Sequence, residues 1–257
     1  SPQRPPVIFQ AGASPRGQEF AARHGEAIFI NGLAPELTRR TTDGIRDKAR
    51  AAGRDGDDVK ILTLATVIVA ETDELARAKH DDFRRYVSLE GSLALYGGWS
   101  GIDLAALDPD EPLRYVDTDA ARSALSIFTK ADPTREWTPR DIAEYVGIGG
   151  IGAVIVGSPT TVADELERWV DVGGVDGFNL AYVITPGTFE DIAEHLTPEL
   201  RRRGLLAADA RPGATLRERL SGSAVVPEWH PAHAYRGAFA GSRTAADGGA
   251  SLVPTTV

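Results

Sequence analysis

A short stretch of small and polar residues, 10–17, carries the side chains best suited to bind a ligand. It reads Gln-Ala-Gly-Ala-Ser-Pro-Arg-Gly and lies between an apolar run and a predicted helix. Small residues let the backbone approach a ligand closely, and the first turn of a helix presents unpaired N–H groups with a favourable dipole. Ser14 adds a hydroxyl donor and Arg16 a positive charge. The stretch could therefore hold a phosphate group.

The same stretch is no established phosphate-binding signature, because it matches neither a Walker loop nor the G-x-G-x-x-G pattern. Tight turns between a strand and a helix use these residue types in any case. Ser14 in the N-cap position would account for the sequence without a ligand. On composition alone, this second arrangement is the commoner one.

A second possible anion site is the stretch 157–164, Gly-Ser-Pro-Thr-Thr-Val-Ala-Asp, which opens another predicted helix. Phosphate sites in barrels of alternating strands and helices often use loops near the last two strands. Here, however, Ser158 as the N-cap with Pro159 in the first helical position explains the sequence fully.

Residues 176–180, Asp-Gly-Phe-Asn-Leu, place a glycine and an asparagine inside a predicted strand. Both residue types are unfavourable there. One explanation is close packing at Gly177 with an Asn179 side chain aimed at a pocket. The other is packing at Gly177 with a satisfied buried amide at Asn179, and the sequence leaves both open.

The histidines do not form a metal site by spacing. His24, His80 and His195 are isolated on predicted helices, and the pair His230 and His233 has no third or fourth ligand nearby. The chain also has no cysteine, which excludes disulfides and thiolate ligands. We therefore predict no metal, and the catalytic residues are unknown.

The elements that position these residues alternate between strand and helix. Apolar runs predict strands at 7–11, 27–30, 59–69 and 176–183, four in all, with a short extended run at 153–156. Helical spacing and capping signals predict helices at 17–24, 37–52, 73–87, 118–130, 138–147, 158–172 and 188–203. The strands lack a clean polar and apolar alternation, which is typical of a parallel sheet covered by helical crossovers.

Two regions are expected along the chain. Residues 1–206 form the α/β part, with an irregular insertion near 88–117 that is rich in Gly, Asp and Pro. Residues 207–257 form a tail, largely irregular or disordered from about 221, because no hydrophobic periodicity continues there.

The composition excludes several classes of function. A net charge of -9 and a pI near 5.1 argue against nucleic acid as a partner. No apolar run could cross a membrane, and the first residues lack signal-peptide character, so we expect a cytoplasmic protein. The chain contains no methionine, and we expect it to be a fragment.

Three ordered segments resemble the nitrilotriacetate/dibenzothiophene-sulfone monooxygenase family of the bacterial-luciferase superfamily. The first is Pro6–Ser14 followed by Gly25–Phe29. The second is Val156–Leu166 with Trp169, followed by Asp176–Leu180. The third is Pro198–Leu205 followed by Thr215–Leu220, so that the resemblance covers about residues 5–220.

The resemblance implies a (β/α)8 TIM barrel of the luciferase-like type, of which this chain holds only the second half, strands 5–8. It implies reduced FMN, FMNH2, supplied by a separate NAD(P)H:flavin reductase, and O2 as co-substrate for oxygenation of a small organic molecule. In such enzymes the turn that matches Gly12, Ala13 and Ser14 contacts the FMN phosphate. Members often carry a histidine where this chain has Gly149–Gly152, which leaves a contact from that position in doubt.

Four strands cannot close a barrel, so two sheet edges and an apolar face would be exposed. We therefore expect a homo-oligomer or a complementing N-terminal half. Two other functions stay open: a non-catalytic remnant that binds a phosphate-bearing ligand or a protein partner, and a luciferase-like oxidoreductase that uses F420.

Overall fold

The computed structural model describes residues 5–115, 117, 128, 135–206 and 212–235. The chain divides into two compact units, Val7–Gly213 and a smaller unit of Ser1–Pro6 with Ala214–Val257.

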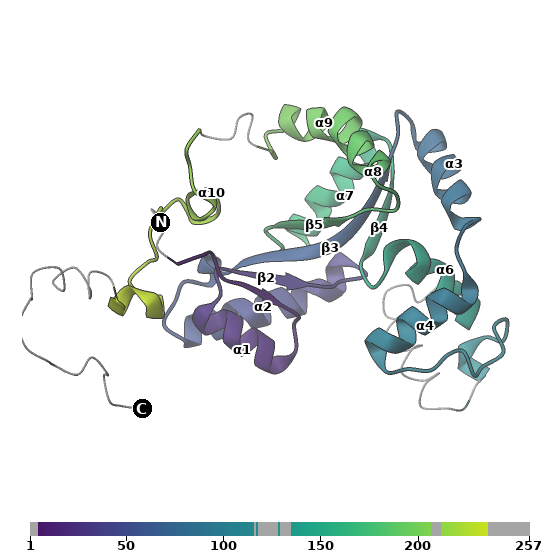
Figure 1. The fold of residues 1–257 in the computed structure, drawn as a ribbon, viewed down its shortest axis with the longest axis horizontal. Coiled ribbons are helices and arrows are strands. Elements are labelled where there is room, and N and C mark those ends of the chain that lie inside the picture. The colour runs from purple at the N-terminus through teal and green to yellow at the C-terminus, as the bar shows by residue number, and fades with distance from the viewer. Residues whose placement is uncertain (1–4, 116, 118–127, 129–134, 207–211, 236–257) are drawn as a thin grey trace, which may run out of the picture. The chain divides into compact units, whose positions relative to one another are not determined.

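The larger unit is built on a parallel sheet of five strands (Figure 1): β1 Phe9–Ala11, β2 Ala27–Ile30, β3 Lys60–Val69, β4 Ala153–Gly157 and β5 Gly177–Ala181. The parallel arrangement is confirmed, but the expected count of four strands is wrong. The short run at 153–157 is a fifth strand, because it pairs with the second half of the long strand β3.

Strand β3 organises this sheet. Leu62 and Thr63 pair with both β2 and β5, so these two strands lie on opposite sides of β3. Ala65 and Thr66 pair with both β4 and β5. Strands β2 and β4 therefore follow one another along the same edge of β3, and β1 extends the sheet beyond β2.

The helices of this unit begin where capping residues predict. Ser14, Thr72, Ser88, Thr138 and Ser158 each accept a backbone N–H bond at a helix start. The helices are α1 Pro15–His24, α2 Pro35–Ala51, α3 Asp73–Arg84, α4 Leu89–Ser100, α6 Pro139–Gly149, α7 Pro159–Asp171, α8 Gly187–Asp191 and α9 Thr197–Arg202, with a π-helical turn at Ile192–Leu196.

One face of the sheet is covered by helices and forms the main core. Ile28 and Ile61 of the strands are fully buried against Ala21 of α1, Ile45 of α2 and Trp169 of α7. Fully burying such a side chain contributes about 1.5–3 kcal/mol. This face holds the unit together.

The opposite face, which we call the open sheet face, is formed by Phe9, Phe29, Leu62, Leu64 and Asn179. Paired residues of parallel strands point to the same side, and the register pairs Phe29 with Leu62 and Leu64 with Asn179. The rings of Phe9 and Phe29 stack with their centroids 5.2 Å apart. The four apolar side chains are half-buried and Asn179 is exposed.

The expected irregular insertion at 88–117 is partly wrong, because Leu89–Ser100 is helix α4. Its three glycines lower helix propensity. Tertiary packing outweighs that cost, since Leu93 and Tyr96 belong to a second core with Ile142 and Val146 of α6. Beyond Gly101 the structure describes bends and one 3₁₀ turn, Leu113–Tyr115.

The smaller unit contains a short helix, α10 Leu216–Ser221, and a 3₁₀ turn, Pro231–Tyr235. The guanidinium of Arg217 donates to the carbonyls of Pro5 and Pro6, both at 3.1 Å. Most of the helix expected at 118–130, and 207–211 and 236–257 of the expected tail, lie outside the described residues. In the described part of the chain, no helix is both long and apolar enough to cross a membrane.

Candidate anion and cofactor site

The turn Gly12, Ala13, Ser14 directly follows β1 and leads into α1. Gly12 has φ +88°, a conformation that favours glycine. Its N–H donates to the carbonyl of Phe29 at 3.1 Å, which fixes the turn to the end of β2. The turn therefore lies at the carboxyl ends of the strands, where ligands bind in folds of this class.

The turn presents several donors that have no partner among the described residues. The hydroxyl oxygen of Ser14 accepts the N–H of Gly17 at 3.1 Å, so its own O–H remains available. The backbone N–H groups of Ala13 and Arg16 make no hydrogen bond in this part of the chain, and the Arg16 side chain is exposed without an acidic partner there. Together with the dipole of α1, these groups suit a phosphate.

Gly17 keeps the turn closed. A Cβ on this residue would lie 2.7 Å from the carbonyl oxygen of Gly12 and 3.2 Å from the Ser14 hydroxyl oxygen. The first distance is too short for any side chain, and the neighbour is backbone. The sequence stretch thus makes a tight cradle at the start of a ten-residue helix, which fits a phosphate group.

The second anion candidate, at Ser158, is already occupied by a side chain of the protein. The carboxylate of Asp73 accepts the N–H of Ser158 at 2.7 Å at the start of α7. Hydrogen bonds from the Ser158 N–H and the Thr161 hydroxyl lower the pKa of Asp73. A phosphate would have to displace this carboxylate, so the turn at Ser14 is the better anion site.

Replacement of Asp73 by asparagine should lower the melting temperature at neutral pH, because it removes the charge at the helix start. The pKa of Asp73 is lowered in the folded chain. Its contribution is therefore present above the unfolded pKa of about 3.9 and is lost as the pH falls through the lower, folded value. Thermal melts between pH 2.5 and 7 should show the wild-type advantage fading at the acidic end.

The exposed neighbour Glu71 provides the control for this measurement, since among the described residues no hydrogen bond or ion pair joins its side chain to α7. Glu71→Gln should melt like the wild type at each pH. An Asp73→Asn deficit that persisted unchanged at pH 2.5 would contradict the assignment.

In the motif at 176–180, Asp176 and Gly177 hold the sheet together, whereas the side chain of Asn179 is free to bind a ligand. The carboxylate of Asp176 accepts the N–H of Ile61 at 2.8 Å and a bond from Arg46 at 3.1 Å, so it ties β5 to β3. A Cβ on Gly177 would lie 3.1 Å from Leu62, which confirms close packing. Asn179 is not a satisfied buried amide: it is exposed and has no hydrogen-bond partner in the described residues.

A cavity of about 690 Å³ lies next to α7 and α9 and not at the Ser14 turn. Its lining includes Glu71, Asp73, Glu74, Glu199 and His195. Arg202 and Arg203 lower the pKa of Glu199 to about 2. Arg202 also lines the cavity, so four carboxylates face one guanidinium there. An anionic phosphate is unfavourable there, and volume alone does not identify the site.

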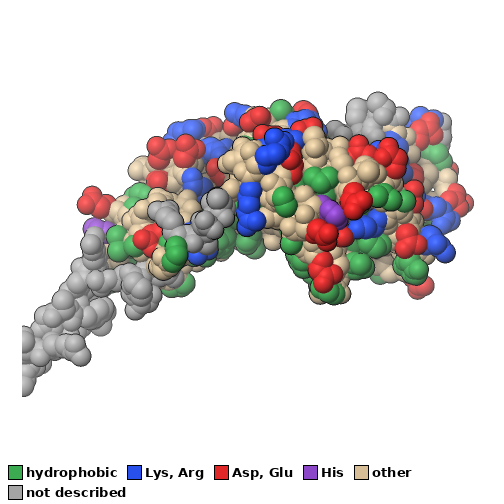
Figure 2. All heavy atoms as spheres, turned by 90° about the horizontal axis from the view of Figure 1, so that it is seen from above, with side chains coloured by type: hydrophobic (Ala, Val, Ile, Leu, Met, Phe, Trp, Pro, Cys, Tyr) green, Lys and Arg blue, Asp and Glu red, His purple; other side chains and the backbone are tan. Residues whose placement is uncertain are grey.

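Charges of both signs are interspersed over this part of the surface (Figure 2). Arg203, directly after α9, forms ion pairs with Asp164 and Glu167 of α7, which connect the two helices. It also pairs with Glu199 of α9. Among the described residues, no three His, Asp or Glu side chains gather as metal ligands.

Sequence reasoning missed a third set of residues, which line an apolar groove of 430 Å³. Tyr86, Leu95 and Ile184 contribute to it from α3–α4 and from the segment after β5. Tyr86 is 77% exposed although it is a large hydrophobic residue. The sequence signal that could have indicated this groove is the apolar run around Leu95. The glycines of α4 made that run look like an irregular segment.

Comparison with known proteins gives matches over most of the chain. The model of the family described as luciferase-like monooxygenase matches residues 1–176. The dimethyl-sulfide monooxygenase of Hyphomicrobium sulfonivorans is 51% identical over 249 residues, 96% of this chain and 52% of that protein. The long-chain alkane monooxygenase of Geobacillus thermodenitrificans is 39% identical over 238 residues, 92% of this chain and 50% of that protein.

The fold is similar to a solved structure as well. The crystal structure of DmoA from Hyphomicrobium sulfonivorans superimposes with a TM-score of 0.85 at 48% identity, over 96% of this chain and 53% of that one. The chain thus spans about half the length of the curated relatives it matches.

Proposed function

Since the chain belongs to the luciferase-like monooxygenase family, we propose that it forms one half of the oxygenase component of a two-component monooxygenase. This enzyme uses reduced FMN, O2 and a small organic substrate. The observation that carries the proposal is the turn Gly12, Ala13, Ser14, which combines free donors, a helix start and a closely packed Gly17. The monooxygenase activities of the relatives at 51% and 39% identity support it.

In this proposal Ser14 and the N–H groups of the turn hold the FMN phosphate. The helix dipole of α1 and the charge of Arg16 favour the phosphate dianion. Bound reduced flavin supplies the oxygen chemistry, while the protein orients it and excludes water. Asn179 contributes an unpaired amide beside Leu64 on the open sheet face, where it can orient a bound molecule.

The pairing of the strands supports an incomplete barrel. Within the described residues β1 pairs only with β2, and β4 and β5 each pair only with β3, so the sheet has free edges. The open sheet face between them is largely apolar, as the inside of a barrel would be. The remaining strands of the barrel, from a second polypeptide segment, would pair the free edges and cover this face.

Two partners follow from the same proposal. A separate NAD(P)H:flavin reductase would supply the reduced flavin, since no second cofactor site is needed on a protein that receives FMNH2. The reaction would take place in the cytoplasm, where such a reductase has its reductant. Homo-oligomers form through the free edges when the complementing half is absent.

Replacing Ser14 by alanine should weaken FMN binding about three- to tenfold, because one charge-assisted hydrogen bond to the phosphate is lost, roughly 1.5 kcal/mol at the upper end of that range. FMN titration followed by flavin fluorescence measures the change. Riboflavin, which lacks the phosphate, should bind equally to both proteins.

Three other results would change this assignment. No binding of FMN by either protein supports a non-catalytic remnant. Binding of F420 in preference to FMN supports the F420-dependent oxidoreductase. An equal FMN affinity in wild type and Ser14→Ala removes the phosphate from this turn. Ser158→Ala serves as the matched control, since it alters the other helix start and should leave FMN affinity unchanged.

A further inference from the structure

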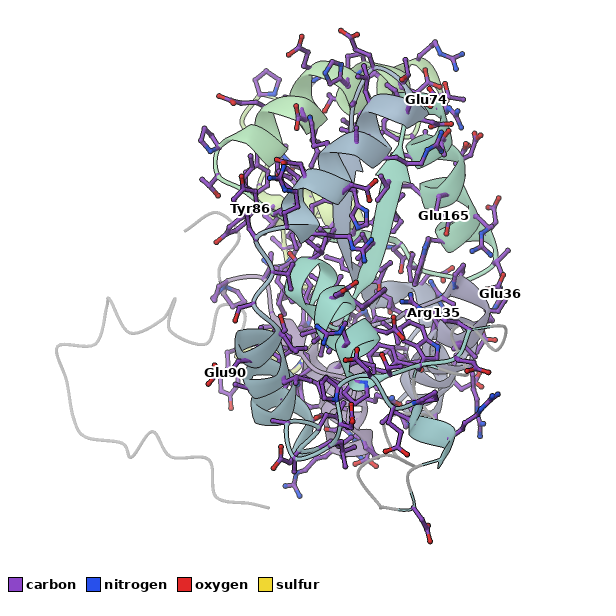
Figure 3. All side chains as sticks on the ribbon, turned by 90° about the vertical axis from the view of Figure 1, so that its right-hand side faces the viewer. Glu36, Glu74, Tyr86, Glu90, Arg135 and Glu165 are labelled. Carbon is purple, nitrogen blue, oxygen red and sulfur yellow. The ribbon has the colours of Figure 1, made fainter. Side chains whose placement is uncertain are left out.

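An apolar groove runs between α3, α4 and the segment that follows β5. Tyr86, Leu95 and Ile184 are 77%, 42% and 47% exposed there, although each is a large hydrophobic residue. Figure 3 shows Tyr86 at the surface near the junction of α3 with α4. Exposed apolar side chains gathered from several elements indicate a binding surface more often than isolated ones do.

The walls of this groove are fixed by close contacts. A Cβ on Gly147 would lie 2.5 Å from a methyl group of Val87 and 2.8 Å from the Ser92 hydroxyl oxygen, so α6 packs directly against the α3–α4 link. On the other side, the hydroxyl of Thr188 accepts the N–H groups of Val183 and Ile184, each at 3.2 Å. The groove is therefore a preformed feature of the fold.

The groove has a distinct charge character. Its lining contains no Lys, Arg or His, and its single charged side chain at neutral pH is that of Asp82, which pairs with Arg85 at 3.2 Å. The remaining polar groups are the hydroxyls of Ser88, Ser92 and Tyr86. A carboxylate-bearing ligand would find no positive partner in it, whereas a neutral molecule loses little on entry.

The size of the groove suits a small molecule. Two of its lining residues, Val183 and Ile184, follow β5 at the carboxyl end of that strand, while Gly147 and Ile148 belong to the end of α6, before β4. Its volume of 430 Å³ is within the range of small-molecule pockets.

From these observations we propose that the groove selects an uncharged, mainly apolar organic substrate, such as a thioether or a short hydrocarbon, and rejects polycarboxylates. This assignment rests on the proposed monooxygenase function. Tyr86, Leu95 and Ile184 are its specificity-determining residues.

The test uses the full chain with methyl-labelled Ile, Leu and Val, titrated with dipropyl sulfide and, separately, with nitrilotriacetate. The sulfide should shift the methyl signals of Leu95, Ile148 and Ile184 saturably and leave those of Val170 on α7 unmoved. Nitrilotriacetate should shift none of the groove signals. Equal binding of both probes, or no sulfide shift at the groove, overturns the proposal.

Two substitutions sharpen the result. Leu95→Arg and Ile184→Lys should each weaken sulfide binding at least tenfold, while Val170→Lys, at a site 43% exposed on α7, should not. Unchanged binding in both groove variants also overturns the proposal. FMN titration of the same samples separates the two hypotheses: sulfide binding without FMN binding removes the monooxygenase function alone, and FMN binding without sulfide binding removes the groove assignment alone.

Discussion

Replacing Gly17 by alanine should lower the affinity for FMN at least tenfold. The added Cβ would lie 2.7 Å from the carbonyl oxygen of Gly12, so the turn has to open and its donors move away from the phosphate. Overpacking of this kind costs typically 1–3 kcal/mol, and 1.4 kcal/mol corresponds to a tenfold change in affinity. The FMN dissociation constant and the melting temperature of the variant give the two readouts.

Gly44→Ala is the matched control for this variant. Gly44 lies in α2, where a new Cβ would meet nothing within 4 Å. The substitution should stabilise the chain by up to about 1 kcal/mol, as helix propensity predicts, and leave FMN binding unchanged. Propensity alone predicts the same gain at Gly17. A Gly17→Ala protein that is more stable and binds FMN normally would contradict the cradle.

Supplying the missing strands should convert a self-associating chain into a defined complex of two halves. The part of the Hyphomicrobium relative that this chain does not match is a suitable complement, because the two proteins are 51% identical where they overlap. Burial of the open sheet face and pairing of the free strand edges drive the association. Light scattering should show a one-to-one complex, and its melting temperature should exceed that of the chain alone.

A charge on the open sheet face should prevent this assembly. Leu62→Asp buries an unpaired carboxylate in the completed barrel, at a cost of several kcal/mol, so the affinity of the halves should fall about a hundredfold or more. Leu37→Asp, on the outside of α2 at 41% exposure, should assemble normally. A stable monomer that does not bind the complementing half would contradict the half-barrel proposal.

Local signals predicted the elements that depend on capping and on buried β-branched runs. Ser14, Thr138 and Ser158 begin helices as expected because an N-cap acts within a few residues. Strand β3 was evident because both faces of its second half are buried, which gives a continuous apolar run.

The failures have a common cause, which is contact between distant segments. The four-residue spacing of Leu37, Thr41, Ile45 and Ala49 predicts helix α2, but it does not fully predict the buried side of that helix. Ile45 and Ala49 are fully buried, whereas Leu37 is 41% exposed and Thr42 is buried as well. The Thr42 hydroxyl donates to the carbonyl of Gly173 at 2.9 Å. Helix α4 depends on its packing against α6. Neither interaction could be found from spacing along the chain.

The candidate site shows the same division. The sequence placed the turn at Gly12, Ala13, Ser14 between a strand and a helix, and the structure agrees. The sequence and the resemblance already favoured this turn over Ser158. The structure adds the physical reason, which is the carboxylate of Asp73, 85 residues away, that accepts the Ser158 N–H. The sequence could not find the groove, whose walls are contributed by four separate segments.

Flavin stoichiometry tests the central claim most directly. FMN is titrated into the chain alone, into the complementing half alone and into their mixture, with bound flavin measured after equilibrium dialysis. The half-barrel account predicts one tightly bound FMN per pair of halves, much weaker binding by either half, and loss of the tight site in the pair that carries Gly17→Ala. Equal binding by the complement alone, or tight binding that survives Gly17→Ala, would contradict it.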